Sequence, residues 1–283
     1  MSQSTVICVC GAGTMGSGIA QLAAQAGYST IQFDSQPAML VKSKEGIQTS
    51  LNKLVEKGKL TATDATAMMA RITFTSNWQH CKASVIIEAI IENATAKVDL
   101  FNQLAGINSN KTIFATNTSS ISLETLAARV EHPERLAGMH FFNPAPVMKL
   151  VEIVKGKQTS AAVIEQLTQL AKNMGKTPVL CKDAPGFIVN RVARPYYLEA
   201  MHIATAFNTD IATIDTLLEA TGFKMGPFRL MDMIGMDVNF AVSNIVWEAL
   251  DKPERLTPSP LQQQKVAAGE LGRKTGKGFY QYL

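Results

Sequence analysis

The stretch "STVICVCGAGTMGSGIAQLAAQAGYSTIQFD", residues 4–34, decides the fold of this chain. It begins with an apolar run rich in valine and isoleucine and turns at a group of glycines. It then continues with helical periodicity and returns to a second apolar run. This order predicts a strand, a tight turn, a helix and a second strand.

The glycines of this turn, Gly11, Gly13 and Gly16, match the pattern GxGxxG, and Asp34 closes the second strand. In such a unit the first glycine permits the turn, the second lets the backbone approach a pyrophosphate, and the third allows close packing of helix on strand. A helix starting near Thr14 offers free N–H groups and its positive end to that pyrophosphate. Asp34 favours NAD over NADP, because a carboxylate binds the adenosine ribose but repels a 2′-phosphate. The alternative is a glycine-rich turn with an ordinary aspartate at a strand end.

Composition limits the class of protein. With 283 residues, 46% hydrophobic and 18% charged, the chain is globular and long enough for two domains. We find no apolar run near the ~18 residues that span a bilayer and no basic segment typical of a secretion signal, so a cytoplasmic protein is expected. The net charge of +4 suits a small acidic ligand but is too weak to indicate nucleic acid. The four scattered cysteines form no CxxC pair, which favours buried free thiols over a metal site.

A long helical pattern follows Pro37 and runs to about residue 60. Ser50, Lys53 and Lys57 lie three and seven residues apart, so they share one face of that helix. A hydroxyl and two ammonium groups on one face can hold a phosphate-bearing ligand. The alternative is an ordinary solvated face of an amphipathic helix.

Further strands alternate with helices up to about residue 117. Buried strands are predicted at 72–77, 83–90 and 112–117, with a helix at 94–106. This alternation implies a parallel, doubly wound sheet, in which ligands bind at the carboxyl ends of the strands. The polar residues at or just beyond such ends are Glu88, Glu92, Asn117, Ser119 and Ser120. Each of them alone is more often a turn or cap residue.

The stretch "AGMHFFNPAPVMKLVEIV", residues 137–154, carries His140 and Glu152 on two predicted strands joined by a proline-rich turn. The separation of twelve residues allows the carboxylate to reach the imidazole, fix its tautomer and stabilise its charged form. A general base that acts near neutral pH needs such a partner. Taken alone, His140 is more often a hydrogen-bonded core histidine.

From about residue 186 onward the pattern is helical, with Asn190 in the first helix. The strand and helix alternation stops near 183–187, which predicts a dinucleotide-binding domain of the Rossmann type at 1–185 and an all-α domain at 186–283. A helical domain of about a hundred residues often needs a partner surface, so we expect a homodimer.

Six motifs in order resemble the L-3-hydroxyacyl-CoA dehydrogenases, including 3-hydroxybutyryl-CoA dehydrogenases, over essentially the whole chain. The motifs are "GAGTMGSGIAQLAA" (11–24), "NTSS" (117–120), "AGMHFFNPAPVMKLVEIV" (137–154), "KDAPGFIVNR" (182–191), "MGPF" (225–228) and "GRKTGKGFY" (272–280).

The resemblance implies a role for each matching residue. His140 is the catalytic histidine and Glu152 its partner, while Ser119 and Asn190 contact the substrate oxygens. The implied contacts to the NAD cofactor are Gly11, Gly13, Thr14, Met15, Gly16, Asp34, Glu92, Lys97, Ser119, Asn143 and Lys274. The implied contacts to coenzyme A are Ser50, Lys57 and Ser119.

The implied reaction is the NAD-dependent oxidation of a (3S)-3-hydroxyacyl-CoA to a 3-oxoacyl-CoA, and its reverse. His140 takes the hydroxyl proton as hydride leaves C3, and the two domains are expected to close on the acyl-CoA. Two alternatives stay open: a dehydrogenase of a free hydroxycarboxylate or sugar acid, and a non-catalytic nucleotide-binding or structural protein. The sequence leaves the preferred acyl group open.

Overall fold

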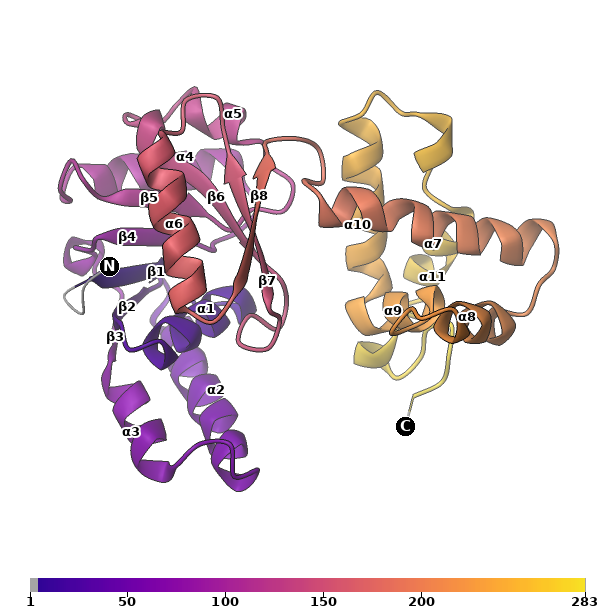
Figure 1. Cartoon of the computed structure of the whole chain (residues 1–283), viewed down its shortest axis with the longest axis horizontal. Coiled ribbons are helices and arrows are strands. Elements are labelled where there is room, and N and C mark those ends of the chain that lie inside the picture. The colour runs from indigo at the N-terminus through magenta and orange to yellow at the C-terminus, as the bar shows by residue number, and fades with distance from the viewer. Residues whose placement is uncertain (1–4, 283) are drawn as a thin grey trace. The chain divides into compact units, whose positions relative to one another are not determined.

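The computed structural model describes residues 5–282 of the chain, which form two compact units that divide between Asp183 and Ala184 (Figure 1). In the first unit, eight strands form one sheet in the order β3-β2-β1-β4-β5-β6-β7-β8. The strands are β1 (Val6–Cys10), β2 (Ser29–Phe33), β3 (Ile72–Thr75), β4 (Val85–Glu88), β5 (Ile113–Thr116), β6 (Leu136–Phe141), β7 (Leu150–Lys155) and β8 (Thr177–Lys182).

The sheet is parallel except at one junction, where β6 pairs antiparallel with β7. This arrangement confirms the predicted mostly parallel, doubly wound sheet. The carboxyl ends of β1, β2, β4, β5 and β6 meet at one edge, which we call the carboxyl edge. The chain adds β2 and β3 on one side of β1 and β4, β5 and β6 on the other, so the strand order reverses between β1 and β4. Ligands bind at such a switch point.

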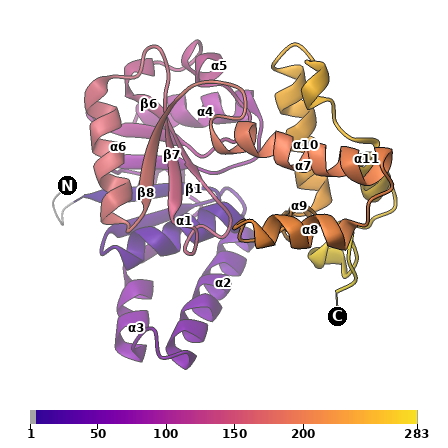
Figure 2. The same ribbon diagram turned by 45° about the vertical axis from the view of Figure 1, so that its right-hand side comes forward.

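Helices cover both faces of the sheet, as right-handed crossovers between parallel strands require. They are α1 (Thr14–Gln25), α2 (Pro37–Glu56), α3 (Ala62–Ala70), α4 (Ala94–Ala105), α5 (Leu123–Ala127) and α6 (Ala161–Asn173). Helices α1 and α6 lie on one face, while α4 and α5 lie on the other (Figures 1 and 2). On the first face, Ile19 of α1 and Leu167 of α6 are fully buried in one core with Val9 and Ile87 of the central strands.

The helix predicted after Pro37 ends at Glu56, and Gly58 takes the left-handed conformation with φ +64° just beyond it. A separate helix, α3, then precedes β3, and the sequence patterns did not indicate it. Its start is capped by the Thr61 side chain, which accepts a hydrogen bond from the Asp64 N–H. With only one buried residue, α3 has too weak an apolar stripe for periodicity to reveal it.

The second unit is all-α, as predicted. Its helices are α7 (Val189–Ala206), α8 (Ile211–Ala220), α9 (Pro227–Ile234), α10 (Met236–Glu248) and α11 (Pro260–Ala267). Two fully or almost fully buried carboxylates attach its C-terminal segment: Asp215 accepts a hydrogen bond from the Tyr280 hydroxyl, and Asp232 accepts one from the Phe279 N–H. These bonds satisfy the buried charges and fix the segment against α8 and α9.

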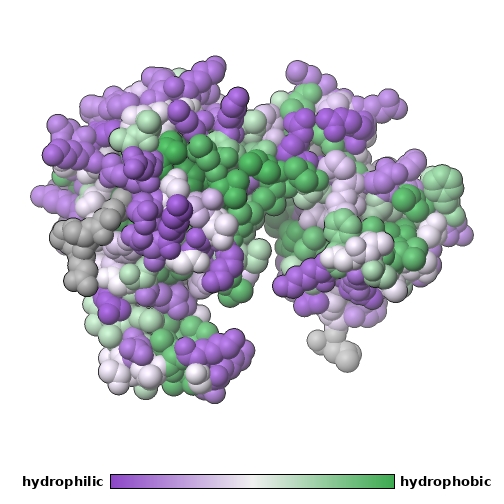
Figure 3. All heavy atoms as spheres, viewed as in Figure 1, coloured by the Kyte–Doolittle hydropathy of each residue, from purple (hydrophilic) through white to green (hydrophobic). Residues whose placement is uncertain are grey.

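Apolar side chains also lie at the surface of the second unit (Figure 3). Val238 and Ile245 of α10 are seven residues apart, on one face of the helix, and are 47% and 38% exposed. Across residues 5–282, no helix combines the length and the apolar character that crossing a membrane requires. The four cysteines are buried and free.

Candidate active site

The glycine turn joins β1 to α1 at the carboxyl edge of the sheet. Gly11 has φ +104°, and a side chain there would lie 2.4 Å from the Ala89 carbonyl oxygen. At Gly16 a Cβ atom would lie 1.9 Å from the Gly11 carbonyl oxygen, so α1 packs against the turn more closely than alanine allows. Gly13 is different, since a Cβ atom there would meet nothing within 4 Å. The space beside Gly13 therefore remains open to a ligand.

Helix α1 begins at Thr14, and Gly13 precedes it without a side chain to cap the first turn. The N–H groups of this turn thus point out of the helix end, where anions bind. Asp34, at the end of β2, accepts hydrogen bonds from the N–H groups of Ala12, at 2.8 Å, and Gln36, at 2.9 Å. This carboxylate stands beside the glycine turn, as binding of an adenosine ribose requires. The residues present fit a dinucleotide.

A cavity of about 400 Å³ lies between α1, α2 and the turn after β6. Gly13 and Thr14 line it on one side and Asn143 on another, and Ser50 of α2 also contributes. The cavity thus brings three of the predicted cofactor residues together with one residue of the predicted coenzyme A face. A second cavity, of about 430 Å³, opens beside Val6 and Lys111 at the start of the strands and is lined by none of the predicted site residues.

His140 and Glu152 face each other across the antiparallel pair of β6 and β7. The imidazole Nδ1 lies 2.7 Å from Glu152 Oε2, and their side chains are 7% and 1% exposed. The Phe142 ring packs on the imidazole with 4.6 Å between ring centroids. This places a shielded histidine and carboxylate pair near the carboxyl edge, which is the arrangement a general base needs.

Asn117 connects this pair to the next strand of the sheet. Its side-chain oxygen accepts a hydrogen bond from the Phe141 N–H at 2.8 Å, directly beyond His140. The backbone N–H of Asn117 donates to the Glu88 carbonyl oxygen, also at 2.8 Å. The ends of β4, β5 and β6 are therefore held in one register at the carboxyl edge.

The loop after β5 carries Ser119 and forms hydrogen bonds to Glu92. The Glu92 carboxylate accepts hydrogen bonds from the Thr118 hydroxyl at 2.5 Å and the Ser120 hydroxyl at 2.7 Å. Burial favours a higher pKa for Glu92, but the Thr118 hydroxyl, the Lys97 ammonium and the Ser120 hydroxyl outweigh it and lower this pKa. Glu92 is therefore a carboxylate in the neutral pH range.

Lys97 does not stand at the surface of the site. Its side chain is 1% exposed, and its ammonium lies 2.5 Å from Glu88 Oε1 and 3.2 Å from Glu92 Oε2. The dominant effect on Glu88 is burial, which raises its pKa from the usual value even though the Lys97 ammonium and the Thr116 hydroxyl act in the opposite direction. The contacts that the structure gives Lys97 are to these two carboxylates.

The remaining predicted residues fall in three places. Met15 lies in the first turn of α1, partly buried against the core. Lys57 is exposed and caps the C-terminus of α2 one turn beyond Lys53. Asn190, in the first turn of α7, and Lys274, whose ammonium lies 2.5 Å from Asp237, belong to the second unit.

Sequence reasoning missed two residues that shape the site. The buried Lys176 ammonium donates to the carbonyl oxygens of Ala145, at 2.6 Å, and Met148, at 2.7 Å, and so holds the turn that carries Asn143. Thr118 stands inside the NTSS motif, yet nothing in the motif singles it out as a partner of Glu92. A lone lysine before a strand likewise gives no sequence signal of its role.

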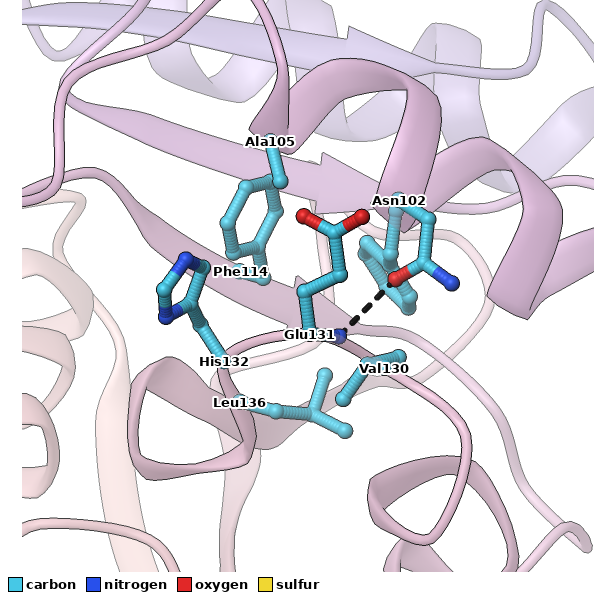
Figure 4. A pocket seen from close by; sticks show the side chains of 8 residues that line it. Asn102, Ala105, Phe114, Val130, Glu131, His132 and Leu136 are labelled. Atoms are coloured by element: carbon cyan, nitrogen blue, oxygen red, sulfur yellow. Dashed lines mark hydrogen bonds between the residues drawn. The ribbon is translucent and has the colours of Figure 1, made fainter.

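A shallow pocket elsewhere in the first unit offers no comparable chemistry. Figure 4 shows Phe114, Val130 and Leu136 around it, with Glu131 and His132 at its rim. The cavity volume is about 10 Å³, room for roughly one water molecule. His132 is 45% exposed and lies 3.5 Å from Glu134, a pairing in contact with solvent that contrasts with the buried pair of His140 and Glu152.

Two family models match the chain. The model described as the 3-hydroxyacyl-CoA dehydrogenase NAD binding domain matches residues 6–184, and that of the C-terminal domain matches residues 186–282. The predicted cofactor, NAD, is confirmed by the first of these matches.

The chain is also similar to individual proteins. It is 46% identical over 278 residues to the 3-hydroxyadipyl-CoA dehydrogenase of Escherichia coli (strain K12), covering 98% of this chain and 58% of that protein. It is 42% identical over 276 residues to a probable 3-hydroxybutyryl-CoA dehydrogenase of Deinococcus radiodurans, covering 97% and 99%.

Solved structures agree with these relationships. The crystal structure of 3-hydroxybutyryl-CoA dehydrogenase from Escherichia coli K12 matches with a TM-score of 0.94 at 45% identity, over 98% of this chain and 59% of that one. That of (S)-3-hydroxybutyryl-CoA dehydrogenase from Ralstonia eutropha matches with a TM-score of 0.93 at 38% identity, over 99% of both. The chain thus spans little more than half of the Escherichia coli proteins and nearly all of the other two. On the family models and on these relatives together, the chain belongs to the 3-hydroxyacyl-CoA dehydrogenase family.

Proposed function

We propose that this protein oxidises (3S)-3-hydroxyacyl-CoA to 3-oxoacyl-CoA with NAD and catalyses the reverse reduction. The observation that carries the proposal is the buried pair of His140 and Glu152, 2.7 Å apart, in the same unit and sheet as the glycine turn. NAD, when bound, accepts the hydride that leaves C3 of the substrate. The protein supplies the proton transfer and the geometry.

His140 is the proposed general base. Because the Glu152 carboxylate accepts a hydrogen bond, Nδ1 carries the proton and Nε2 is the nitrogen that takes the proton of the C3 hydroxyl. The imidazolium formed in this step stands beside the Glu152 charge, which stabilises it. In the reduction, the protonated His140 returns the proton to the C3 oxygen.

Ser119 and Asn190 are the proposed donors of hydrogen bonds to the substrate oxygens, which places C3 for hydride transfer. The glycine turn, Asp34 and Asn143 are proposed to hold the cofactor, together with Met15, Glu92 and Lys274. Their positions beside the turn or the cavity support this assignment for Asp34 and Asn143.

Coenzyme A is proposed to bind along α2 through Ser50 and Lys57. Ser50 lines the 400 Å³ cavity and the Lys57 ammonium is exposed at the end of the same helix, where it can meet a phosphate. We expect Lys57→Ala to raise KM for acetoacetyl-CoA several-fold with kcat unchanged. Lys44→Ala, an exposed lysine elsewhere on α2, is the matched control and should leave KM unchanged.

Oxidation of NADH with acetoacetyl-CoA, compared with free acetoacetate, tests the function. Activity on the thioester and none on the free acid is the expected result. Equal activity on both would favour the dehydrogenase of a free hydroxycarboxylate, and none on either would favour a non-catalytic protein.

The preferred acyl group follows from a series of kcat/KM values. Because the relatives carry the names of 3-hydroxybutyryl-CoA and 3-hydroxyadipyl-CoA dehydrogenases, the series should include both a short and a dicarboxylic acyl-CoA. We propose 3-hydroxybutyryl-CoA as the preferred substrate. A higher kcat/KM for the dicarboxylic thioester would contradict this.

We further propose a cytoplasmic homodimer that associates through the helices of the second unit. The exposed Val238 and Ile245 on one face of α10 support an apolar interface. Sedimentation should give twice the mass of one chain, and a monomer at working concentrations would contradict the dimer. Cell fractionation tests the location.

A further inference from the structure

Three charged side chains, Glu88, Lys97 and Glu92, link the end of β4 to the loop after β5, and the first two of them are buried. Glu88 is fully buried and Lys97 is 1% exposed, whereas Glu92 is 39% exposed. An ammonium group removed from water is costly unless a carboxylate compensates it. Lys97 therefore depends on Glu88 Oε1, which lies 2.5 Å from its nitrogen.

Glu88 is held on every side. Its Oε1 also accepts a hydrogen bond from the Ile90 N–H at 2.7 Å, and its Oε2 accepts one from the Thr116 hydroxyl at 2.7 Å. Through these bonds one carboxylate joins β4, β5 and the first turn of α4. Such a fully satisfied buried network is rigid, and removing one member leaves the others unpaired.

Glu92 connects this network to the loop after β5, residues 117–120, which we call the serine loop. Its Oε2 faces Lys97 at 3.2 Å. Its Oε1 faces the loop, where the hydroxyls of Thr118 and Ser120 and the N–H groups of Ser119 and Ser120 all point to it. Oε1 of Glu92 thus accepts the hydrogen bonds of the turn that carries Ser119, while Oε2 forms the ion pair with the buried Lys97.

The arrangement distinguishes Ser119 from its neighbours. Of the three consecutive hydroxyl groups, those of Thr118 and Ser120 donate to Glu92. Within residues 5–282, Ser119 contributes only its backbone N–H to the hydrogen bonds of the structure. The loop therefore leaves the Ser119 hydroxyl for a ligand.

We propose that Glu88 and Lys97 are positioning residues for the reaction: the buried pair holds Glu92 at the serine loop and thereby sets the place of the Ser119 hydroxyl. This inference rests on the proposed function, in which Ser119 contacts the substrate oxygen. It gives Lys97 an internal role, since its ammonium faces two carboxylates.

The test is a double-mutant cycle of Glu88→Gln and Ser119→Ala on the full chain. Glutamine keeps the size of Glu88 but removes its charge, so that Glu92 is drawn toward Lys97 and away from the loop. We expect Glu88→Gln to lower kcat/KM for acetoacetyl-CoA at least tenfold in the wild type. In the Ser119→Ala background, where the positioned hydroxyl is already missing, it should lower kcat/KM less than twofold.

Ile87→Val is the matched control for a loss of packing on the same strand. Ile87 is fully buried on β4 but packs in the core away from the charged groups. It should change kcat/KM less than twofold in both backgrounds, even where the melting temperature falls. A similar loss for Ile87→Val and Glu88→Gln would make the Glu88 effect one of stability and overturn the proposal.

A second variant covers the case in which Glu88→Gln does not fold. Ser120→Ala removes one donor to Glu92 at a half-buried position and should lower kcat/KM about threefold in the wild type and not in the Ser119→Ala background. The proposal would be overturned if Glu88→Gln or Ser120→Ala lowered kcat/KM by the same factor in the wild type and in the Ser119→Ala background. A weaker affinity for NADH with kcat unchanged would overturn it as well.

These outcomes are separable from the function itself. A wild-type protein inactive on acetoacetyl-CoA overturns the proposed function and this inference with it. An active wild type with independent Glu88 and Ser119 effects overturns the inference alone.

Discussion

Replacing Glu152 with glutamine tests the partnership at the centre of the site. The change removes a charge 2.7 Å from His140 Nδ1 but keeps the size of a side chain that is 1% exposed. The amide oxygen can still accept the hydrogen bond, so the tautomer and the ring orientation should persist. What is lost is the carboxylate beside the imidazolium that forms as the substrate is oxidised.

The magnitude follows from burial. Two unit charges about 4 Å apart in an environment of effective dielectric constant about 20 attract by roughly 4 kcal/mol. A hydrogen bond to a charged group contributes about 1.5–3 kcal/mol. A loss of about 2.5–4 kcal/mol in the transition state corresponds to a fall in kcat of roughly 10²–10³-fold, at about 1.4 kcal/mol for each tenfold.

The assay is steady-state oxidation of NADH with acetoacetyl-CoA, together with NADH binding and a melting curve to show that the variant is folded. The chain offers a matched control in Glu134→Gln, because Glu134 also faces a histidine, His132, at 3.5 Å, with both side chains about half exposed. An exposed pair of this kind contributes about 0–1 kcal/mol. The control should therefore keep kcat within about twofold.

A folded Glu152→Gln protein with at least a third of the wild-type kcat would refute the reasoning. Should the variant not fold, His140→Gln gives the same test from the other partner. It should lower kcat by orders of magnitude while NADH affinity changes less than twofold, and normal turnover would remove His140 from the base role.

Three further predictions concern the cofactor site and the second unit. Gly16→Ala should lower the melting temperature strongly, as calorimetry would show, because its Cβ would lie 1.9 Å from a carbonyl oxygen. The Cβ of Gly13→Ala meets nothing within 4 Å, so this variant should fold normally but bind NADH more weakly in a fluorescence titration. Asp34→Ala should reduce the preference for NADH over NADPH at least tenfold, by comparison of kcat/KM, since the carboxylate no longer repels a 2′-phosphate. Two lysines lower the pKa of Glu270 to about 2, so this carboxylate stabilises the fold above its usual pKa of 4.5 and loses that effect as pH falls toward 2. The difference in melting temperature between wild type and Glu270→Gln should therefore be present at pH 7 and shrink below about pH 4.5; a difference independent of pH would contradict the pairing.

Much of the fold and part of the site follow from local sequence. The strand, glycine turn and helix of residues 6–25 form from contiguous residues, and the close packing of Gly16 on the Gly11 carbonyl oxygen is a contact within that unit. The pairing of His140 with Glu152 is also accessible, because a short proline-rich turn between two strands leaves few possible registers. In both cases the residues that interact are close along the chain, so periodicity and spacing are enough.

Other features depend on residues that only the fold brings together. In the sequence, Lys97 looks like an ordinary residue of the helix that follows β4. Only its burial between Glu88 and Glu92 shows that it acts inside the protein. The motif NTSS offers three adjacent hydroxyls of equal standing, and the position of Glu92, 27 residues before Ser119, separates the middle one from the others. The sequence by itself determined the class of fold, the cofactor and the histidine pair. The tertiary structure decided which charges are buried and which hydroxyl is left for a ligand, because desolvation and hydrogen-bond competition depend on neighbours from distant segments.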